Sequence, residues 1–220
     1  GMMGAVALDA SPLRGRKLLN LDSEAEGVFT VSCAGGSMAR CALPVTRTAF
    51  AGTVLEVRVR GLVGGHSGTE IHKGRANANA VLGRLLQAMG AETELRLVTA
   101  AGGGKDNAIP VESSAQVVAS DEAAARQAAE QMAAALTREY AVADPGLRVE
   151  VTACEVSETP MDRASTEKAL CMLTCLPNGV QAMSLDIPGL VQTSLNLGIL
   201  TTEADRLPAT FCVRSSLGSH

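Results

Sequence analysis

The sequence predicts an α+β fold in which an antiparallel sheet has helices packed on one face. Three observations lead to this prediction. TVLEVRVRGL (residues 53–62) alternates apolar and polar residues with period two, which is typical of a strand with one solvent-facing side. ANANAVLGRLLQAM (residues 76–89) instead places its apolar residues at helical spacing. Along the chain, strands and helices mix without the strict βα alternation of a parallel sheet, which favours the α+β class.

The N-terminal part of the sequence predicts one short helix and then extended segments. Residues 2–10 suit a helix that ends at Ser11 and Pro12, because the residue before a proline is pushed out of the helical region. Three extended segments follow, at residues 18–23, 27–36 and 37–49. Pro44 confines the last of them to a sheet edge or a bulge, since proline cannot donate to a central ladder.

Two further helices and five strands are predicted beyond residue 90. Asp121 can cap a long Ala-rich helix over residues 122–141, and Glu122 lies favourably in its first turn. A helix over residues 165–176 is expected to take Ser165 as its cap. The remaining strands are predicted at residues 93–100, 111–120, 147–156, 190–203 and 207–216.

Composition excludes several classes of function. The chain is 46% hydrophobic with a net charge of −4, but only 2% aromatic. The scarcity of aromatic rings counts against single-stranded nucleic-acid binding, and the acidic balance counts against duplex binding. No apolar run reaches the roughly 18 residues of a membrane span, and no signal peptide is visible, so we expect a cytoplasmic protein. Because the opening GMMGAVALDA resembles the inside of a helix, we expect the chain to be a piece of a longer protein.

The cysteines predict no disulfide framework. Six of them are scattered along the chain without a CxxC pair, which is typical of reduced, mostly buried thiols in a cytosolic protein. Cys171 and Cys175 are four residues apart and would share a helix face, where buried packing is favoured over a metal clip.

GLVGGHSGTEIH (residues 61–72) is the first candidate for chemistry. His66 lies among glycines directly after a predicted strand, and such glycines let a backbone approach a ligand closely. The alternative, a surface turn in which the histidine only tolerates an unusual backbone angle, stays equally open. His72 is expected to be structural or solvent-facing.

Two other residues are candidates on their own. Asp22 follows a predicted apolar strand, where it could face a site or simply cap a turn. Arg214 lies in the apolar context FCVRSS, so it belongs either to a structural ion pair or to an anion receptor. The glycine-rich GGGKDNAIP lacks the GK[ST] ending of a phosphate loop and is rejected as a nucleotide site.

Taken together, the motifs resemble a known family. Its marks occur in this order: LNLDSEAEG, CAGG, GLVGGHSGTEIHKGRANANAVLGRLL, GGGKDNAIP, LPNGV, VQTSLNLGIL and FCVRSS. This series is similar to the bacterial Xaa-His dipeptidases (aminoacyl-histidine dipeptidase, peptidase D), a branch of the di-zinc exopeptidases. The resemblance covers nearly the whole chain, and its GGHSGxEIHxGxxNAN block is specific.

The resemblance implies a ferredoxin-like but enlarged lid and dimerisation domain over residues 37–216. Residues 1–36 would be a strip of the catalytic domain, and residues 217–220 a tail. Asp22 matches the family's aspartate ligand to one zinc, and His66 matches the lid histidine that reaches over the active site. Asn107 and Arg214 match the lid residues that hold the free carboxylate of a dipeptide substrate.

The family's other metal ligands and its general base have no counterpart in this sequence. Two divalent metal ions, with zinc expected, therefore belong to the full-length enzyme, and we expect none to be stably bound by this chain alone, because catalytic zinc needs about three protein ligands. The chain alone is predicted to be inactive. Expected partners are a small dipeptide, the missing catalytic domain and a second copy bound through the lid, but no nucleic acid or membrane. The rival interpretation is a non-enzymatic domain that dimerises or binds a small anion.

Overall fold

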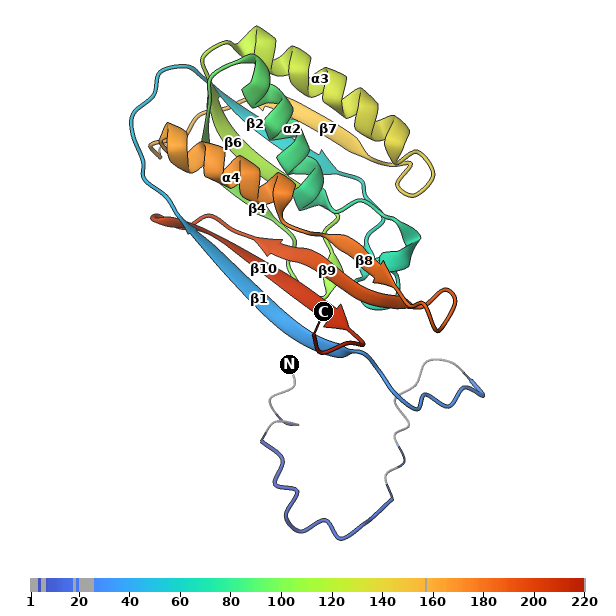
Figure 1. Cartoon of the computed structure of the whole chain (residues 1–220). Helices are drawn as coiled ribbons and strands as arrows, with labels where there is room; N and C mark the ends of the chain where they lie inside the picture. The colour runs from blue at the N-terminus through green and yellow to red at the C-terminus, as the bar shows by residue number, and fades with distance from the viewer. Residues whose placement is uncertain (1–3, 5–6, 18, 20–25, 157, 220) are drawn as a thin grey trace. The chain divides into compact units, whose positions relative to one another are not determined.

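The computed structural model describes residues 4, 7–17, 19, 26–156 and 158–219, and it divides the chain into two compact units, Gly1–Cys33 and Ala34–His220. The second unit contains all the strands and helices named below (Figure 1). It confirms the predicted α+β class, because a large antiparallel sheet is covered by three helices.

The sheet has two sections. The strand order is β1 (Gly35–Pro44), β10 (Arg206–Ser215), β9 (Val191–Leu200), β4 (Leu95–Gly102), β6 (Ser113–Ala119), β2 (Thr53–Arg60) and β7 (Arg148–Ala153). A further strand, β8 (Gly179–Met183), pairs with β9. Among the described residues, β4 meets β9 at one register pair, Gly102 with Leu200. The section formed by β4, β6, β2 and β7 is therefore joined to the other section at the ends of two strands.

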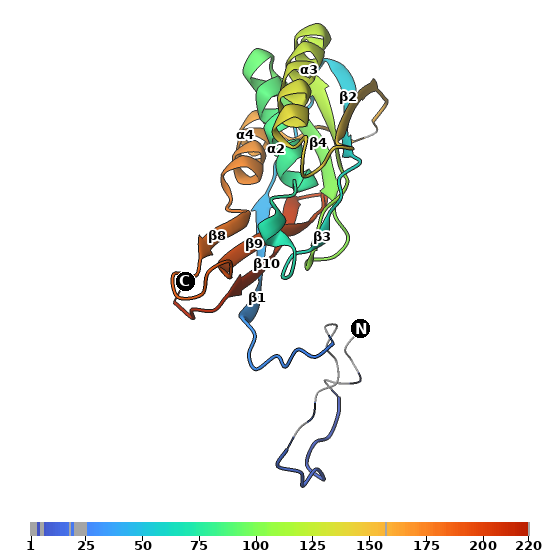
Figure 2. The ribbon, with the colours of Figure 1, turned by 90° about the vertical axis from the view of Figure 1, so that its right-hand side faces the viewer.

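Three helices cover one face of the sheet: α2 (Ala78–Glu92), α3 (Glu122–Glu139) and α4 (Arg163–Cys175) (Figures 1 and 2). The inward side of α2 consists of Val81, Leu82, Leu85, Leu86 and Met89, all at most 1% exposed. They join Leu55, Val57 and Val59 of β2 in one core. A fully buried aliphatic side chain contributes about 1.5–3 kcal/mol to stability. The apolar residues that the two periodicities mark in the sequence are therefore the ones that hold the helix against the sheet.

One predicted helix cap is confirmed and one is wrong. The carboxylate of Asp121 accepts a hydrogen bond from the backbone amide of Ala124 and caps α3. Helix α4, however, is capped by Asp162, whose carboxylate accepts from the Ser165 amide at 2.7 Å. Ser165 lies in the first turn, where its hydroxyl instead accepts from the Thr46 amide. The serine is used in a tertiary contact, which the local sequence does not reveal.

Several predictions for the N-terminal part of the chain are wrong or lie outside the described residues. The helix predicted at residues 2–10 is wrong for residues 7–10, which are described and are not helical. The strand predicted at residues 18–23, including Asp22, lies mostly outside the described residues. The strand predicted at 27–36 is wrong for residues 28–34, because β1 begins only at Gly35 and those residues pair with no strand in the described part of the chain. Extended structure up to Pro44 is confirmed, and β1 is an edge strand as proline requires. Strand β8 was not predicted.

The expectation of buried cysteines is wrong. None of the six is buried, and Cys171 and Cys175 are exposed on α4. The two thiols do share a face, but α4 packs through Thr166, Ala169 and Leu173, which lie on its other side. A hydrogen bond with the Cys175 thiol raises the pKa of the Cys171 thiol.

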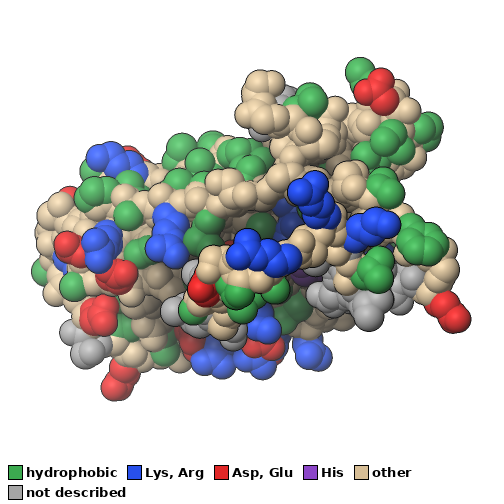
Figure 3. All heavy atoms as spheres, turned by 90° about the horizontal axis from the view of Figure 1, so that it is seen from below, with side chains coloured by type: hydrophobic (Ala, Val, Ile, Leu, Met, Phe, Trp, Pro, Cys, Tyr) green, Lys and Arg blue, Asp and Glu red, His purple; other side chains and the backbone are tan. Residues whose placement is uncertain are grey.

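On the one face of the molecule that Figure 3 shows, charged side chains of both signs are present. Seen from below, Lys and Arg side chains are interspersed with acidic and apolar ones (Figure 3). No helix in the described part of the chain combines the length and apolarity that a membrane crossing demands.

Candidate active-site lid

Two loops meet in a short ribbon that carries His66 and Asn107. Strand β3 (Gly65–His66) pairs antiparallel with β5 (Ala108–Ile109), so that His66 lies opposite Ala108. One residue further, the backbone amide of Ser67 donates to the carbonyl oxygen of Asn107 at 2.9 Å. The glycine-rich motif and the NAIP motif, which are far apart in sequence, are therefore neighbours in space.

The imidazole of His66 is fixed at one nitrogen and exposed at the other end. Its Nδ1 accepts hydrogen bonds from the backbone amides of Gly68 and Thr69, both at 3.3 Å. A nitrogen that accepts cannot carry the proton of the neutral ring, so that proton lies on Nε2. The loop thus presents an Nε2–H donor on an exposed side chain.

Arg214 reaches the same loop from the C-terminal end of β10. Its register partners are Gly36 on β1 and Ser194 on β9. A side-chain carbon added at Gly68 would lie 3.0 Å from the guanidinium carbon of Arg214 and 3.0 Å from Cε1 of His66. Glycine at position 68 therefore leaves room for the guanidinium and the imidazole to approach the same point of the loop.

Two polar atoms at this point have no protein partner. The Nε of Arg214 and the hydroxyl of Ser67 are buried and make no hydrogen bond within the described residues. Leaving such a group unpaired costs about 1–3 kcal/mol, and more for a charged one. Unpaired buried donors beside an exposed histidine are what a binding site for an oxygen-rich anion requires.

Glu70 braces the histidine loop. Its carboxylate accepts from the backbone amide of His66 at 3.0 Å, from Lys73 at 2.6 Å and from Arg75 at 3.2 Å. Arg75 also donates to the carbonyl oxygen of Gly64. The hydrogen bonds from Lys73 and the His66 amide lower the pKa of Glu70 to about 2, so the brace is ionised over the whole neutral range.

A network of asparagines lies behind the ribbon, and two of its members, Asn77 and Asn196, are buried. Asn77 donates through Nδ2 to Oδ1 of Asn178 at 3.1 Å and to Oδ1 of Asn196 at 3.2 Å. Asn196 in turn donates to the backbone carbonyls of Asp106 and Ala108. These asparagines lie in the RANAN, LPNGV and TSLNLG motifs, but the sequence predicts no separate role for them. Their recurrence in otherwise apolar segments was the available signal.

Asp144 binds both ends of the segment that carries His66, at Val63 and at Ala76. It is 1% exposed, and its carboxylate accepts from the Val63 amide and the Ala76 amide, each at 2.7 Å. Its role could not be predicted from the sequence, because an aspartate before Pro145 and Gly146 has the signature of a turn.

The other predicted residues do not join this group. Asp22 lies outside the described residues. His72 is exposed on η1 (Ile71–Lys73), as expected. Among the described residues, no cluster of three or more His, Cys, Asp or Glu side chains could hold a metal ion. The described part of the chain therefore does not by itself supply the donor set of a metal centre.

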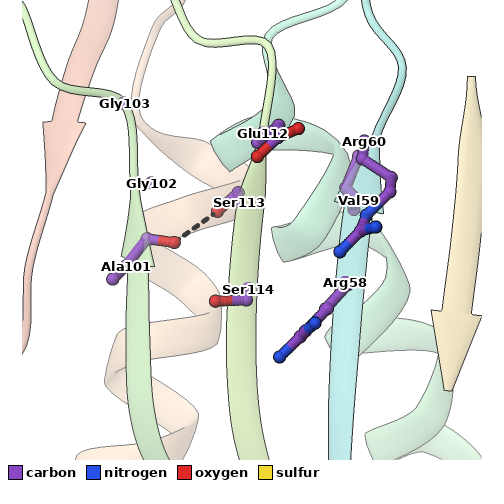
Figure 4. Close-up of a pocket in the computed structure, with 9 residues that line it drawn as sticks. All are labelled: Arg58, Val59, Arg60, Ala101, Gly102, Gly103, Glu112, Ser113 and Ser114. Atoms are coloured by element: carbon purple, nitrogen blue, oxygen red, sulfur yellow. Dashed lines mark hydrogen bonds between the residues drawn. The ribbon is translucent and has the colours of Figure 1, made fainter. Parts of the chain in front are cut away.

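A separate cavity of about 430 Å³ lies on the sheet face away from the helices, over strands β2, β6 and β4 (Figure 4). Arg58 and Arg60 point into it, but both already have acidic partners. Arg58 lies 2.8 Å from Glu56, and Arg60 lies 3.7 Å from Glu150. The cavity offers no unpaired buried donor like that of Arg214, and we therefore place the candidate site at the His66 loop.

Part of the chain is similar to a known protein family. Residues 57–144 match the family described as the peptidase dimerisation domain. The match begins in β2 and ends after α3, and the strands β1, β9 and β10 extend the sheet beyond it. Residues 57–144 are therefore similar to a peptidase dimerisation domain.

Two dipeptidases are similar to this chain over its whole length. The chain is 34% identical to the cytosol non-specific dipeptidase of Escherichia coli (strain K12), with all of this chain and 46% of that protein covered. Aminoacylhistidine dipeptidase from Vibrio alginolyticus has the same fold, with a TM-score of 0.87, 34% identity, and all of this chain and 46% of that one covered. The chain is homologous to these dipeptidases, which confirms the resemblance read from the motifs. It spans about half the length of both relatives.

Proposed function

We propose that this chain is the substrate-binding lid of a metal-dependent dipeptidase and supplies the groups that bind the peptide rather than those that hold metal. The observation that carries the proposal is the unpaired, buried Nε of Arg214 beside the His66 loop. A small peptide with a free carboxylate would satisfy it. The homology to dipeptidases supports this class of substrate.

Each residue has a role that its geometry supports. The Nε2–H of His66 would donate to the carbonyl oxygen of the scissile peptide, where negative charge develops. Such donors contribute roughly 10²- to 10³-fold in rate elsewhere. The guanidinium of Arg214 and the side chain of Asn107 would hold the terminal carboxylate, since a planar guanidinium can pair with both of its oxygens.

The catalytic metals are proposed for the whole enzyme. Two divalent ions, with zinc expected, would activate the attacking water, and Asp22 is proposed as one of their ligands. Because the other metal ligands and the general base of the family have no counterpart in this sequence, we propose that the chain alone binds no catalytic metal stably and has no peptidase activity. Hydrolysis of Ala-His or Gly-His with added zinc tests this, and turnover that is abolished by His66→Ala would contradict it.

The dimerisation domain supports a homodimer, and the name of the Escherichia coli relative supports a cytoplasmic location. Residues 37–216 would form the lid and residues 1–36 a strip of the catalytic domain. The rival proposal, a non-enzymatic domain that dimerises or binds a small anion, needs no dipeptide chemistry at His66.

The deciding experiment compares substrates in the full-length protein. Arg214→Ala should raise KM for a dipeptide with a free carboxylate by on the order of a hundredfold, as expected when a charge-assisted pair is lost. KM for the amidated dipeptide should change little. Equal effects on both substrates would remove the assigned role, and a full-length protein without dipeptidase activity would favour the rival.

A further inference from the structure

We infer that Asn196 is a positioning residue that holds Asn107 and His66 in register for the dipeptide. The inference rests on the proposed function of those two residues. Asn196 lies in β9 and is 1% exposed.

A single side-chain amide clamps the loop on both sides of Asn107. The Nδ2 of Asn196 donates to the carbonyl oxygen of Asp106 and to that of Ala108, each at 2.8 Å. Both amide hydrogens are therefore used on the residues that flank Asn107. The backbone of Asp106 also packs against Gly198, where any side chain would collide with it. Asn107 is left as the exposed residue at the tip of a clamped turn.

The orientation of the clamp is determined by its neighbours. Oδ1 of Asn196 accepts from Nδ2 of Asn77, so the other end of the amide must be the donor. Asn77 is fixed in turn, because its Oδ1 caps α2 by accepting from the Asn79 amide at 3.0 Å. An aspartate at position 196 would place an acceptor against two carbonyl oxygens, and an alanine would leave both without a partner.

The clamp extends to the histidine. Ala108 lies opposite His66 in the ribbon, and the carbonyl of Asn107 accepts from the Ser67 amide. A shift of residues 106–108 would therefore move the carboxylate-binding group and the oxyanion donor together. Misplacement of catalytic groups by about 1 Å can cost on the order of a hundredfold in rate.

The test compares Asn196→Ala and the isosteric Asn196→Asp with Asn79→Ala in the full-length protein. Asn79 is equally buried and donates to the carbonyls of Gly102 and Leu197, but it makes no hydrogen bond to residues 106–108. The readout is the ratio of kcat/KM for a free-carboxylate dipeptide to that for its amide. Loss of folded protein alone lowers both values equally and leaves the ratio unchanged.

Both Asn196 variants should lower the ratio by about tenfold or more, and Asn79→Ala should leave it within about twofold. In the unaltered protein, both side-chain amide hydrogens of Asn196 should exchange slowly with solvent. The inference is overturned if these hydrogens exchange freely, or if the ratio survives in the Asn196 variants while Asn107→Ala abolishes it. If Asn107→Ala and Arg214→Ala also leave the ratio unchanged, the proposed function fails and this inference fails with it.

Discussion

The backbone amide of Ser67 donates to the carbonyl oxygen of Asn107 across 2.9 Å, which joins the glycine-rich loop to the NAIP loop. Because His66 precedes the donor and Asn107 is the acceptor, this bond sets the distance between two proposed substrate-binding side chains. Arg214 approaches the same loop at Gly68. We therefore expect a small increase in side-chain volume at position 68 to displace Arg214 and His66.

Gly68→Ala should impair the proposed activity of the full-length protein without unfolding it. The added methyl group would lie 3.0 Å from both Arg214 and His66, and these side chains would have to shift by a few tenths of an ångström to admit it. Their displacement should reduce kcat/KM by about tenfold or more. Gly104→Ala is the matched control, because a side chain there meets open space. Equal activity of the two variants would show that the space at Gly68 is not used by the site.

The ring of His66 should be a single tautomer. Two backbone amides donate to Nδ1, so ¹⁵N NMR of the neutral imidazole should show a protonated Nε2 and an unprotonated Nδ1. His72, exposed on η1, is the internal control and should show the mixture of tautomers found in free imidazole. A proton on Nδ1 of His66 would leave no donor for an oxyanion at Nε2.

Local patterns predicted the parts of the fold that local forces determine. The alternation in β2 and the helical spacing in α2 placed Val57 and Leu82 in the core, where both are fully buried. Ser165 was misassigned as a cap because its hydroxyl serves Thr46, which is distant in sequence. Residues 28–34 have the pattern of a strand, yet a strand also needs an edge to pair with.

The residues of the candidate site also form two groups, those that the sequence predicted and those that it did not. Motif resemblance pointed to His66, Asn107 and Arg214, and the structure places all three around one loop. The supporting residues Asn196 and Asp144 were missed, because their function is to satisfy backbone groups of distant segments. Only the three-dimensional arrangement shows which carbonyls and amides need them.

Glu70 should titrate near pH 2. Hydrogen bonds from Lys73 and the His66 amide lower its pKa from the ordinary 4.5 to about 2. A carboxylate whose pKa falls on folding stabilises the folded state fully above about pH 4.5 and loses this contribution as the pH falls through about 2. Carboxyl ¹³C NMR should give the midpoint, and Lys73→Met should move it upward. A midpoint at the ordinary value would mean that the brace on the His66 loop is not formed.

Asp144→Ala should destabilise the chain more than any single cap. Its carboxylate satisfies the amides of Val63 and Ala76, and both would be left without a partner around a buried gap. We expect the free energy of unfolding to fall by about 2–4 kcal/mol, since each unpaired buried amide costs about 1–3 kcal/mol. Asp144→Asn keeps one acceptor oxygen and should lose roughly half as much.

The matched control for Asp144 is Asp121→Ala. It removes one hydrogen bond to the Ala124 amide at an exposed helix end, a change that costs about 1 kcal/mol. Urea denaturation of the three variants measures all these differences on one scale. If Asp144→Ala cost no more than Asp121→Ala, solvent would have to reach the amides of Val63 and Ala76. The segment that carries His66 would then be held by Glu70 and the β3–β5 ribbon alone, and its position would be far less restricted than the proposed oxyanion role requires.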